Sequence, residues 1–419
     1  MDSRRVRTYR DLFAVREFRA LFAATSASVA ASTLSGLALG TLVYDRTGSP
    51  LLAALSMFGS SFGQVLGATT LLSAADRLRP RPTLTSQSAL FALVTLLFAL
   101  PGLPVVAILA LGLSLGVVSS LGSAVRWGLV TEILPEGGYI LGRSALNMAV
   151  GTMQITGYAT GAVLLHRLSV PALLIIGAAL YAVAGLAIAR GTTARPARAT
   201  GRASVRETWS GNRALLGDRH VRHLLLASWV PNGLVVGAEA LFIPYAGRDA
   251  GALFVAAALG MLAGDVLVGR VLTPRLRRVL VTPTRVLLAL PYLAFAASPG
   301  LPLAVALVAL ASVGFCATVL QQERMVAVTP AERRGQLLGL QSSGMLTMQA
   351  VGASLAGLVA EALPVGQAMT AMAVASLLAS ALLTPGLREP TRSGGDRTGS
   401  AVVATPPGSR DHLTEPAVD

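Results

Sequence analysis

Two carboxylates stand alone inside long apolar stretches of this chain. Glu239 follows the run LLLASWVPNGLVVGA, and Asp265 lies within LFVAAALGMLAGDVLVG. An acid in such surroundings is costly without a partner, and a buried carboxyl group can bind and release a proton near neutral pH. We therefore predict that Asp265 or Glu239 couples proton movement to another process. Two other interpretations are open: Asp265 pairs with Arg270, or Glu239 faces water near the end of its helix.

Polar residues also recur at matched places. Residues 152–157 read TMQITG and residues 347–352 read TMQAVG. Glycine lets two helices approach closely, while glutamine offers an amide either to a neighbouring helix or to a polar cavity, and both roles are open here. Arg126 has a second interpretation as an anchor for a loop or for lipid. The residues predicted to line a cavity are Gln64, Arg126, Asn147, Gln154, Asn232 and Gln349.

The sequence contains no pattern typical of a metal site or of a catalytic nucleophile. The chain has one cysteine, Cys316, and four scattered histidines, none at metal-ligand spacing with another. No Ser/His/Asp set and no phosphate-binding loop is present. We predict that the protein is not an enzyme and that it uses no metal and no cofactor.

The elements that position these residues are membrane helices. Of 419 residues, 53% are hydrophobic and 13% are charged, which is too apolar for a soluble domain. Apolar runs of about 18 residues or more recur along the chain. We predict an all-α integral membrane protein with twelve transmembrane helices. The spans are expected at 20–43, 50–73, 83–101, 103–125, 140–165, 168–189, 222–245, 250–271, 281–298, 301–321, 335–361 and 364–386.

Arginine distribution predicts the orientation. An even number of spans places both ends on one side, and with that side inside, only Arg46, Arg167 and Arg248 of the 34 basic residues lie outside. This is a strong positive-inside signal, so both termini are predicted to be cytoplasmic in the cell (inner or plasma) membrane. The net charge of +14 then reflects membrane topology and not nucleic-acid binding. We expect a monomer in the lipid bilayer.

The chain also repeats itself. The TMQxxG copies and the pair Pro135/Pro330 are 195 residues apart, while RLR (77–79 and 275–277) and PGLP (101–104 and 299–302) recur at 198. These offsets predict two parallel six-helix repeats. The expected domains are a cytoplasmic N-terminus (1–19), an N-terminal half (20–189), a cytoplasmic central loop (190–221), a C-terminal half (222–386) and a disordered cytoplasmic tail (387–419).

Three segments carry a family resemblance: VYDRTGSP (43–50), LLSAADRLRPRP (71–82) and AVRWGLVTEILPEGGYILGRSALNM (124–148). They resemble the major facilitator superfamily, and within it the drug:proton antiporter-3 branch, which includes macrolide efflux pumps and the enterobactin exporter. The resemblance implies proton antiport in a major facilitator fold, and it favours Asp265 over Glu239 because the eighth helix lines the cavity of that fold.

The same resemblance implies an inner gate. Asp76, Arg77 and Arg81 match the superfamily signature G-x-x-x-D-R-x-G-R-R. In the family this aspartate meets the positive N-terminal end of helix 11, which would lie near residues 334–336 here.

Few fixed charges and few aromatics in the spans favour a substrate that is mostly apolar with scattered hydrogen-bonding groups. We expect proton-coupled export of a small amphiphilic compound (a drug, a secondary metabolite or a siderophore) by alternating access. A non-transporting sensor or scaffold of the same fold, or an importer of a small nutrient, is the alternative.

Overall fold

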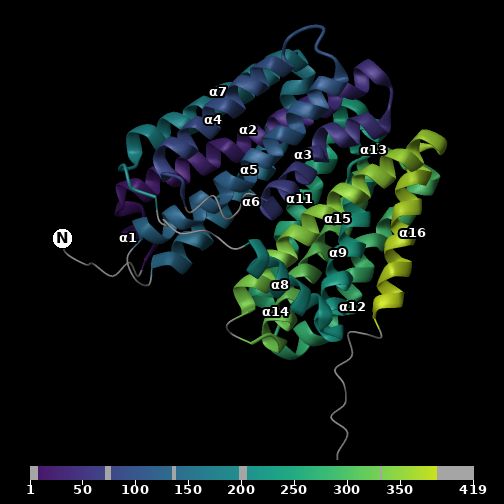
Figure 1. Ribbon diagram of the computed structural model, residues 1–419. Helices are drawn as coiled ribbons and strands as arrows, with labels where there is room; N and C mark the ends of the chain where they lie inside the picture. The colour runs from purple at the N-terminus through teal and green to yellow at the C-terminus, as the bar shows by residue number, and fades with distance from the viewer. Residues whose placement is uncertain (1–7, 71–76, 135–137, 198–204, 331–332, 385–419) are drawn as a thin grey trace, which may run out of the picture. The chain divides into compact units, whose positions relative to one another are not determined.

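The computed structural model describes residues 8–70, 77–134, 138–197, 205–330 and 333–384, and all regular structure within them is helical (Figure 1). A short helix, α1 (Tyr9–Ala14), precedes six long ones. These are α2 (Arg16–Thr47), α3 (Pro50–Thr70), α4 (Pro80–Phe98), α5 (Val105–Ile133), α6 (Gly138–Arg167) and α7 (Val170–Gly191).

The C-terminal half is more segmented. Its main helices are α9 (Arg219–Glu239), α11 (Ala250–Val266), α12 (Pro274–Ala289), α13 (Leu301–Val313), α14 (Ala317–Val328), α15 (Arg334–Ala362) and α16 (Val365–Leu383). Its shorter elements are α8 (Val205–Gly217), α10 (Phe242–Ala246), the 3-10 helices η2 (Gly247–Asp249), η4 (Leu290–Ala297) and η5 (Gly314–Cys316), and the π-helical turn η3 (Leu267–Val271). The helix α8 lies in the segment expected to be a loop.

Local sequence explains several helix boundaries. Thr8 and Asp11 form a capping box at α1, and the Asp218 carboxylate accepts from two backbone N–H groups at the start of α9. Both contacts satisfy donors that a helix N-terminus leaves free. Gly48 ends α2 at φ 66°, a left-handed conformation that glycine adopts without strain.

The helices account for twelve membrane crossings. Ten stretches of the described residues are long and apolar enough to span a bilayer. One of them, 219–271, contains two antiparallel helices, α9 and α11, and the 19-residue α4 is not among the ten. Adding these two gives the twelve that the sequence predicts.

The two halves repeat one packing scheme, which confirms the predicted repeat. In the first half α2 packs on α6 and α7, and α3 packs on α5. In the second half α9 packs on α15 and α16, and α11 packs on α13. The halves meet through α3 on α15 and α6 on α11. The helices α3 and α11 are equivalent in the two halves, and so are α6 and α15. The two contacts between the halves are therefore equivalent to each other.

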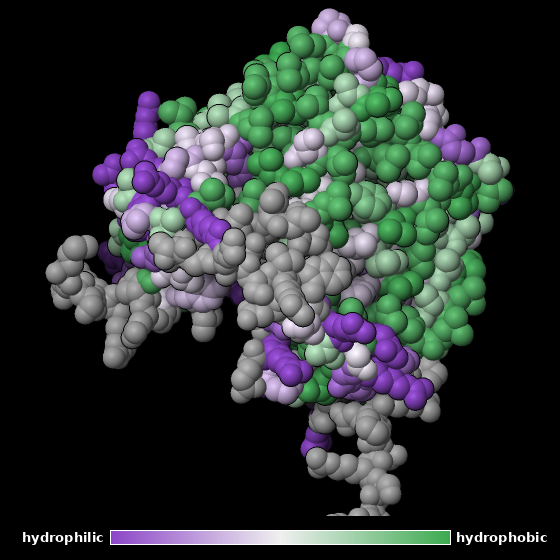
Figure 2. All heavy atoms as spheres, in the orientation of Figure 1, coloured by the Kyte–Doolittle hydropathy of each residue, from purple (hydrophilic) through white to green (hydrophobic). Residues whose placement is uncertain are grey.

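Apolar side chains cover much of the helical surface. In Figure 2 the hydrophobic colour extends over α13, α15 and α16, while hydrophilic side chains gather near α1 and near α12 and α14. Val106, Val279 and Leu382 are each more than 70% exposed. Exposed apolar area on this scale requires a lipid environment. We call the helix ends near Arg190, Arg222 and Arg324 the Arg-rich end, and those near Arg46 and Arg248 the Arg-poor end.

Candidate functional site

The two halves are in close contact at the Arg-poor end. A Cβ added to Gly251 of α11 would overlap Ala162 of α6, and one added to Gly357 of α15 would lie 2.6 Å from the Cα of Leu51 in α3. The Glu361 carboxylate accepts from the Leu51 backbone N–H at 3.3 Å and from the Ser49 hydroxyl. Two glycines therefore determine how closely the halves approach here.

Polar contacts extend this junction to its surface. His166 Nε2 lies 3.2 Å from Asp249 Oδ1, and Arg248 Nη1 donates to the Leu165 carbonyl at 3.2 Å. His166 and Leu165 end α6, while Arg248 and Asp249 precede α11. We call this set of contacts, with Gly251 and Gly357, the Arg-poor seam.

The buried cores show the same one-sided contact. At the Arg-poor end one core contains residues of both halves, among them Leu37 and Phe242. At the Arg-rich end each half has its own core, around Leu129 in the first and Leu225 in the second. The ring of Tyr158 stacks on Phe254 across the seam, with centroids 4.8 Å apart. The structure is thus closed at the Arg-poor end.

Predicted cavity residues continue the faces that form the seam. On α6, Asn147, Gln154, Tyr158 and Ala162 are spaced by seven, four and four residues and so share one face. Ala162 and Tyr158 contact the other half, whereas Gln154 and Asn147, farther toward the Arg-rich end, are exposed. Along this face the side chains change from contact with the other half at Ala162 and Tyr158 to exposure at Gln154 and Asn147.

Asp265 lies on the corresponding face of α11. It follows Gly251 and Phe254, which both contact α6, by fourteen and eleven residues, and this spacing returns it to their side of the helix. The two helices run in opposite directions and pair Gly251 with Ala162 and Phe254 with Tyr158. Asp265 and Asn147 both lie beyond these contacts, toward the Arg-rich end, and both are exposed. No ion pair between Asp265 and Arg270 is present among the described contacts.

Glu239 occupies a different place, within the closed end. Its side chain is 6% exposed, and its Oε1 accepts from the Tyr292 hydroxyl of η4 at 3.5 Å. Tyr158 of the opposite half lies within Coulombic range of the carboxylate. The acid is therefore buried beside the seam and not exposed to water in this conformation.

The two TMQxxG signatures have different surroundings. Gly157 packs on α2 at Thr33, and Gly352 packs on the backbone of Gly233 in α9, so both glycines permit close helix contact as predicted. Gln349 Nε2 donates to Asn232 Oδ1 at 3.2 Å, which ties α15 to α9, while Gln154 makes no such contact and is exposed. Of the predicted cavity set, only Asn232 and Gln349 are in direct contact.

The remaining predicted residues are dispersed. Gln64 and Arg126 are half-buried on α3 and α5. Arg81 Nη2 donates to the Ala189 carbonyl of α7, Arg77 is exposed, and Asp76 lies outside the described residues. Within the described segments, no group of three or more His, Cys, Asp or Glu side chains could hold a metal ion.

Pro231 interrupts the hydrogen bonding of α9, a feature that the sequence analysis does not predict. Pro231 has no N–H to donate to the Ala227 carbonyl four residues earlier. Gln321 Nε2 of α14 donates to that carbonyl at 3.1 Å instead, and Ser376 Oγ of α16 donates to the Pro231 carbonyl at 2.9 Å. Gln321 and Ser376 are 1% and 0% exposed, so α14 and α16 supply the hydrogen bonds at the break.

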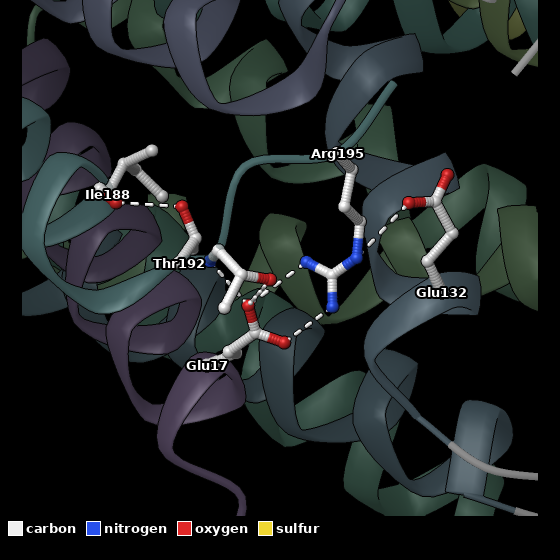
Figure 3. Close-up of polar contacts among 6 residues, drawn as sticks. Glu17, Glu132, Ile188, Thr192 and Arg195 are labelled. Atoms are coloured by element: carbon white, nitrogen blue, oxygen red, sulfur yellow. Dashed lines mark hydrogen bonds and ion pairs between the residues drawn. The ribbon is translucent and has the colours of Figure 1, made fainter. Parts of the chain in front are cut away.

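A charge network at the Arg-rich end also had no sequence signal (Figure 3). Arg195, just after α7, lies 2.6 Å from Glu17 Oε2 and 3.5 Å from Glu132 Oε2. Glu17 Oε1 also accepts from the Thr193 backbone N–H at 2.6 Å and its hydroxyl at 2.7 Å. The network joins the start of α2, the end of α5 and the segment after α7.

These contacts keep the Glu17 carboxylate ionised. The residue precedes the apolar part of α2. Burial alone would raise its pKa, but the hydrogen bonds from Arg195 and Thr193 and the charge of Arg195 outweigh burial and lower the pKa from 4.5 to about 2. The hydrogen bond to Glu17, opposed by burial, raises the pKa of Arg195.

Glu17→Gln is expected to lower the melting temperature of the purified protein, by about 1 °C for each kcal/mol lost in a chain of this length. Because the folded-state pKa is depressed, the wild-type advantage is complete above about pH 4.5 and is lost as the pH falls toward about 2. Melting curves from pH 7 down to pH 3 measure it. Glu323→Gln, which removes an exposed partner of Arg277 at 3.8 Å, is the control and should change little. A wild-type advantage of constant size at every pH would contradict this prediction.

Comparison with known proteins identifies a family of membrane transporters. The family model described as Major Facilitator Superfamily matches residues 21–321. No curated protein matches the chain in sequence.

Solved structures are similar over most of the chain. A bacterial homologue of the human lysosomal transporter Spinster, inward-facing and unoccupied, has a TM-score of 0.70 at 14% identity, covering 89% of this chain and 96% of that one. A POT family transporter in complex with 5-aminolevulinic acid scores 0.69 at 12% identity, covering 89% and 97%. The human organic anion transporter MFSD10 (TETRAN) scores 0.61 at 19% identity, covering 88% and 99%. At these identities the likeness establishes the fold.

Proposed function

Because the chain belongs to the Major Facilitator Superfamily, we propose that it is a secondary active transporter that exports a small amphiphilic compound in exchange for protons. The Arg-rich end faces the cytoplasm in this proposal, as the arginine distribution favours. One observation carries it: among the described residues the halves are in close contact at the Arg-poor end, at Gly251 and Phe254, while the exposed Asp265 and Asn147 lie farther toward the Arg-rich end.

Alternating access then requires the seam to open. Rocking of the halves would separate Gly251 from Ala162 and Gly357 from Leu51, and would bring the Arg-rich ends together. The inner gate in that second state would use Asp76, Arg77 and Arg81. The contact of Arg81 with the Ala189 carbonyl holds the start of α4 against α7 and supports a rigid first half.

Two acids divide the coupling between them in this proposal. Asp265 is exposed on α11, and in this proposal it exchanges a proton for the substrate in a cavity between the halves. Glu239 lies against the closed seam, where a charged carboxylate without a cationic partner is costly. Opening the seam would give Glu239 access to water on the outer side.

The lining suits an amphiphilic substrate. On the paired faces of α6 and α11, Asn147 and Gln154 offer amides and Asp265 offers one charge among apolar residues. A hydrophobic drug, secondary metabolite or siderophore with scattered polar groups fits this composition. The sequence resemblance to the drug:proton antiporter-3 branch supports export.

Expression in a host that lacks its own efflux pumps is expected to raise resistance to at least one hydrophobic antibiotic, because such compounds re-enter through the bilayer and must be exported continually. A protonophore should abolish the resistance. Minimum inhibitory concentrations and dye accumulation measure both effects. An Asp265→Asn variant expressed at the same level is the matched control and should give no resistance. Uptake of a hydrophilic nutrient without any change in drug tolerance, or substrate binding without flux in sealed vesicles, would refute the exporter.

A further inference from the structure

Arg285 is a cation buried inside the C-terminal half. It lies on α12 and is 1% exposed, and its Nη2 donates to the Ser380 carbonyl of α16 at a long 3.4 Å. Its Nε and Nη1 atoms have no hydrogen-bond partner in the structure. Within the described part of the chain no carboxylate pairs with it.

A second unpartnered group lies beside it. The hydroxyl of Ser380 is also buried and has no partner, although the carbonyl of the same residue receives Arg285. A guanidinium group can only donate, whereas a serine hydroxyl can donate one hydrogen bond and can also accept. The Ser380 hydroxyl accepts none from Arg285 in the structure, so two donor atoms of the cation have no acceptor among the described residues.

The charge of Arg285 cannot be removed by deprotonation. A guanidinium group keeps its proton in proteins, and a buried charge without a partner costs several kcal/mol. The cost is smaller where a negative charge accompanies the cation into the interior. The surroundings of Arg285 thus call for a counter-charge that the described residues do not provide.

The first half needs no such counter-charge at the equivalent position. The repeat offset of 198 residues pairs Arg285 with Gln87, and the offset of 195 pairs Ser380 with Gly185. Gln87 is neutral, and its Nε2 donates to the Val118 carbonyl at 3.4 Å. The surplus of donors is therefore particular to the C-terminal half.

We propose that Arg285 and Ser380 hold a small inorganic anion, of the size of chloride, between α12 and α16. Val281, Leu288 and Ala289 on the same helix are at most 3% exposed, so apolar side chains bury the surroundings of Arg285 on α12. Ser376, one turn before Ser380, donates to the Pro231 carbonyl, so the anion lies next to the break in α9. This site is separate from the space between the halves that the proposed transport uses.

Thermal unfolding of the purified full chain tests the site. We expect the melting temperature to rise in a saturable manner when sodium gluconate is replaced by sodium chloride at constant ionic strength. For a chain of this length, a shift of about 1–2 °C corresponds to the stabilisation by a ligand present a few-fold above its dissociation constant. Sodium bromide should act as chloride does.

Variants of two arginines on the same helix separate the specific effect from a general salt effect. Arg285→Gln should remove the chloride response, whereas Arg277→Gln, in which the lost side chain pairs with Glu323 near the helix start, should retain it. If Arg285→Gln does not fold, Arg285→Lys keeps the charge and should show a weaker response. Bromide-soaked crystals should give an anomalous peak beside Arg285. Equal melting temperatures in chloride and gluconate for the wild type, or a chloride response that survives in Arg285→Gln, would overturn the proposal and leave water alone at the site.

Discussion

The double substitution Gly251→Leu and Gly357→Leu is expected to abolish transport while leaving each half folded. The added side chains would overlap Ala162 and Leu51 of the opposite half, and they point away from the core of their own half. Overpacking a close contact costs about 1–3 kcal/mol. A change of that size shifts the ratio of closed to open seam by roughly 5- to 150-fold for each site. The protein would be held with its Arg-poor end open.

Distances between spin labels measure this shift. The single cysteine, Cys316, is buried and can be replaced by serine. Labels at the exposed Ser169 and Ala297 report the Arg-poor end, and labels at Thr131 and Gln322 report the Arg-rich end. The double variant should lengthen the first distance and shorten the second.

A matched control comes from α5. A Cβ on Gly112 meets nothing within 4 Å, so Gly112→Leu should leave both distances and transport unchanged. Normal transport by the seam variant with unchanged distances would show that the seam is not a moving contact.

Neutralising the two acids is expected to stop proton exchange in two different ways. Asp265→Asn removes the exposed titratable group on α11 that is proposed to exchange a proton for the substrate, so substrate added to proteoliposomes should release no protons. Glu239→Gln keeps a neutral side chain beside Tyr292 and removes the cost of a buried charge. This second variant should favour the closed seam.

Proton flux and label distances together distinguish the two roles. Both variants should reduce substrate-driven proton flux to the level of empty vesicles, but only Glu239→Gln should shorten the distance between labels at Ser169 and Ala297. Asp45→Asn changes an exposed acid near the same end, in α2 and outside the seam, and serves as the control, with flux retained. Wild-type flux in both acid variants would place the coupling elsewhere, for example at Glu132 or Glu323 near the Arg-rich end.

The repeat explains why so much of the fold follows from sequence. Twelve apolar runs and two recurring offsets predict the paired halves, and the glycines of the TMQxxG signatures predict close helix contacts that Gly157 and Gly352 make. These features are local, or they are related by a fixed offset. The position of Asp265 within the eighth span, 250–271, also follows from a local apolar run, and the structure has this residue in α11.

Features that depend on three-dimensional neighbours could not be predicted. Gln154 and Gln349 have the same local sequence, yet only Gln349 meets an amide, because Asn232 has no counterpart facing Gln154. Arg285 reads as one more positive residue near a span end, and only the packing of α12 on α16 shows that it is buried. The partners of Arg195 lie 178 and 63 positions away in the chain, with no motif to link them.

The break at Pro231 has a consequence for biosynthesis. When α9 enters the membrane during translation, the carbonyl of Ala227 lacks the donor that satisfies it in the finished protein, because Gln321 of α14 has not yet been made. A free carbonyl in lipid is costly, so α9 remains incomplete until α14 leaves the ribosome. The first half reaches its own closing contact, Arg195 with Glu17, as soon as α7 is finished. During synthesis the first half can therefore fold before the second half does. Membrane proteases would cleave the second half of an incomplete chain more readily than the first.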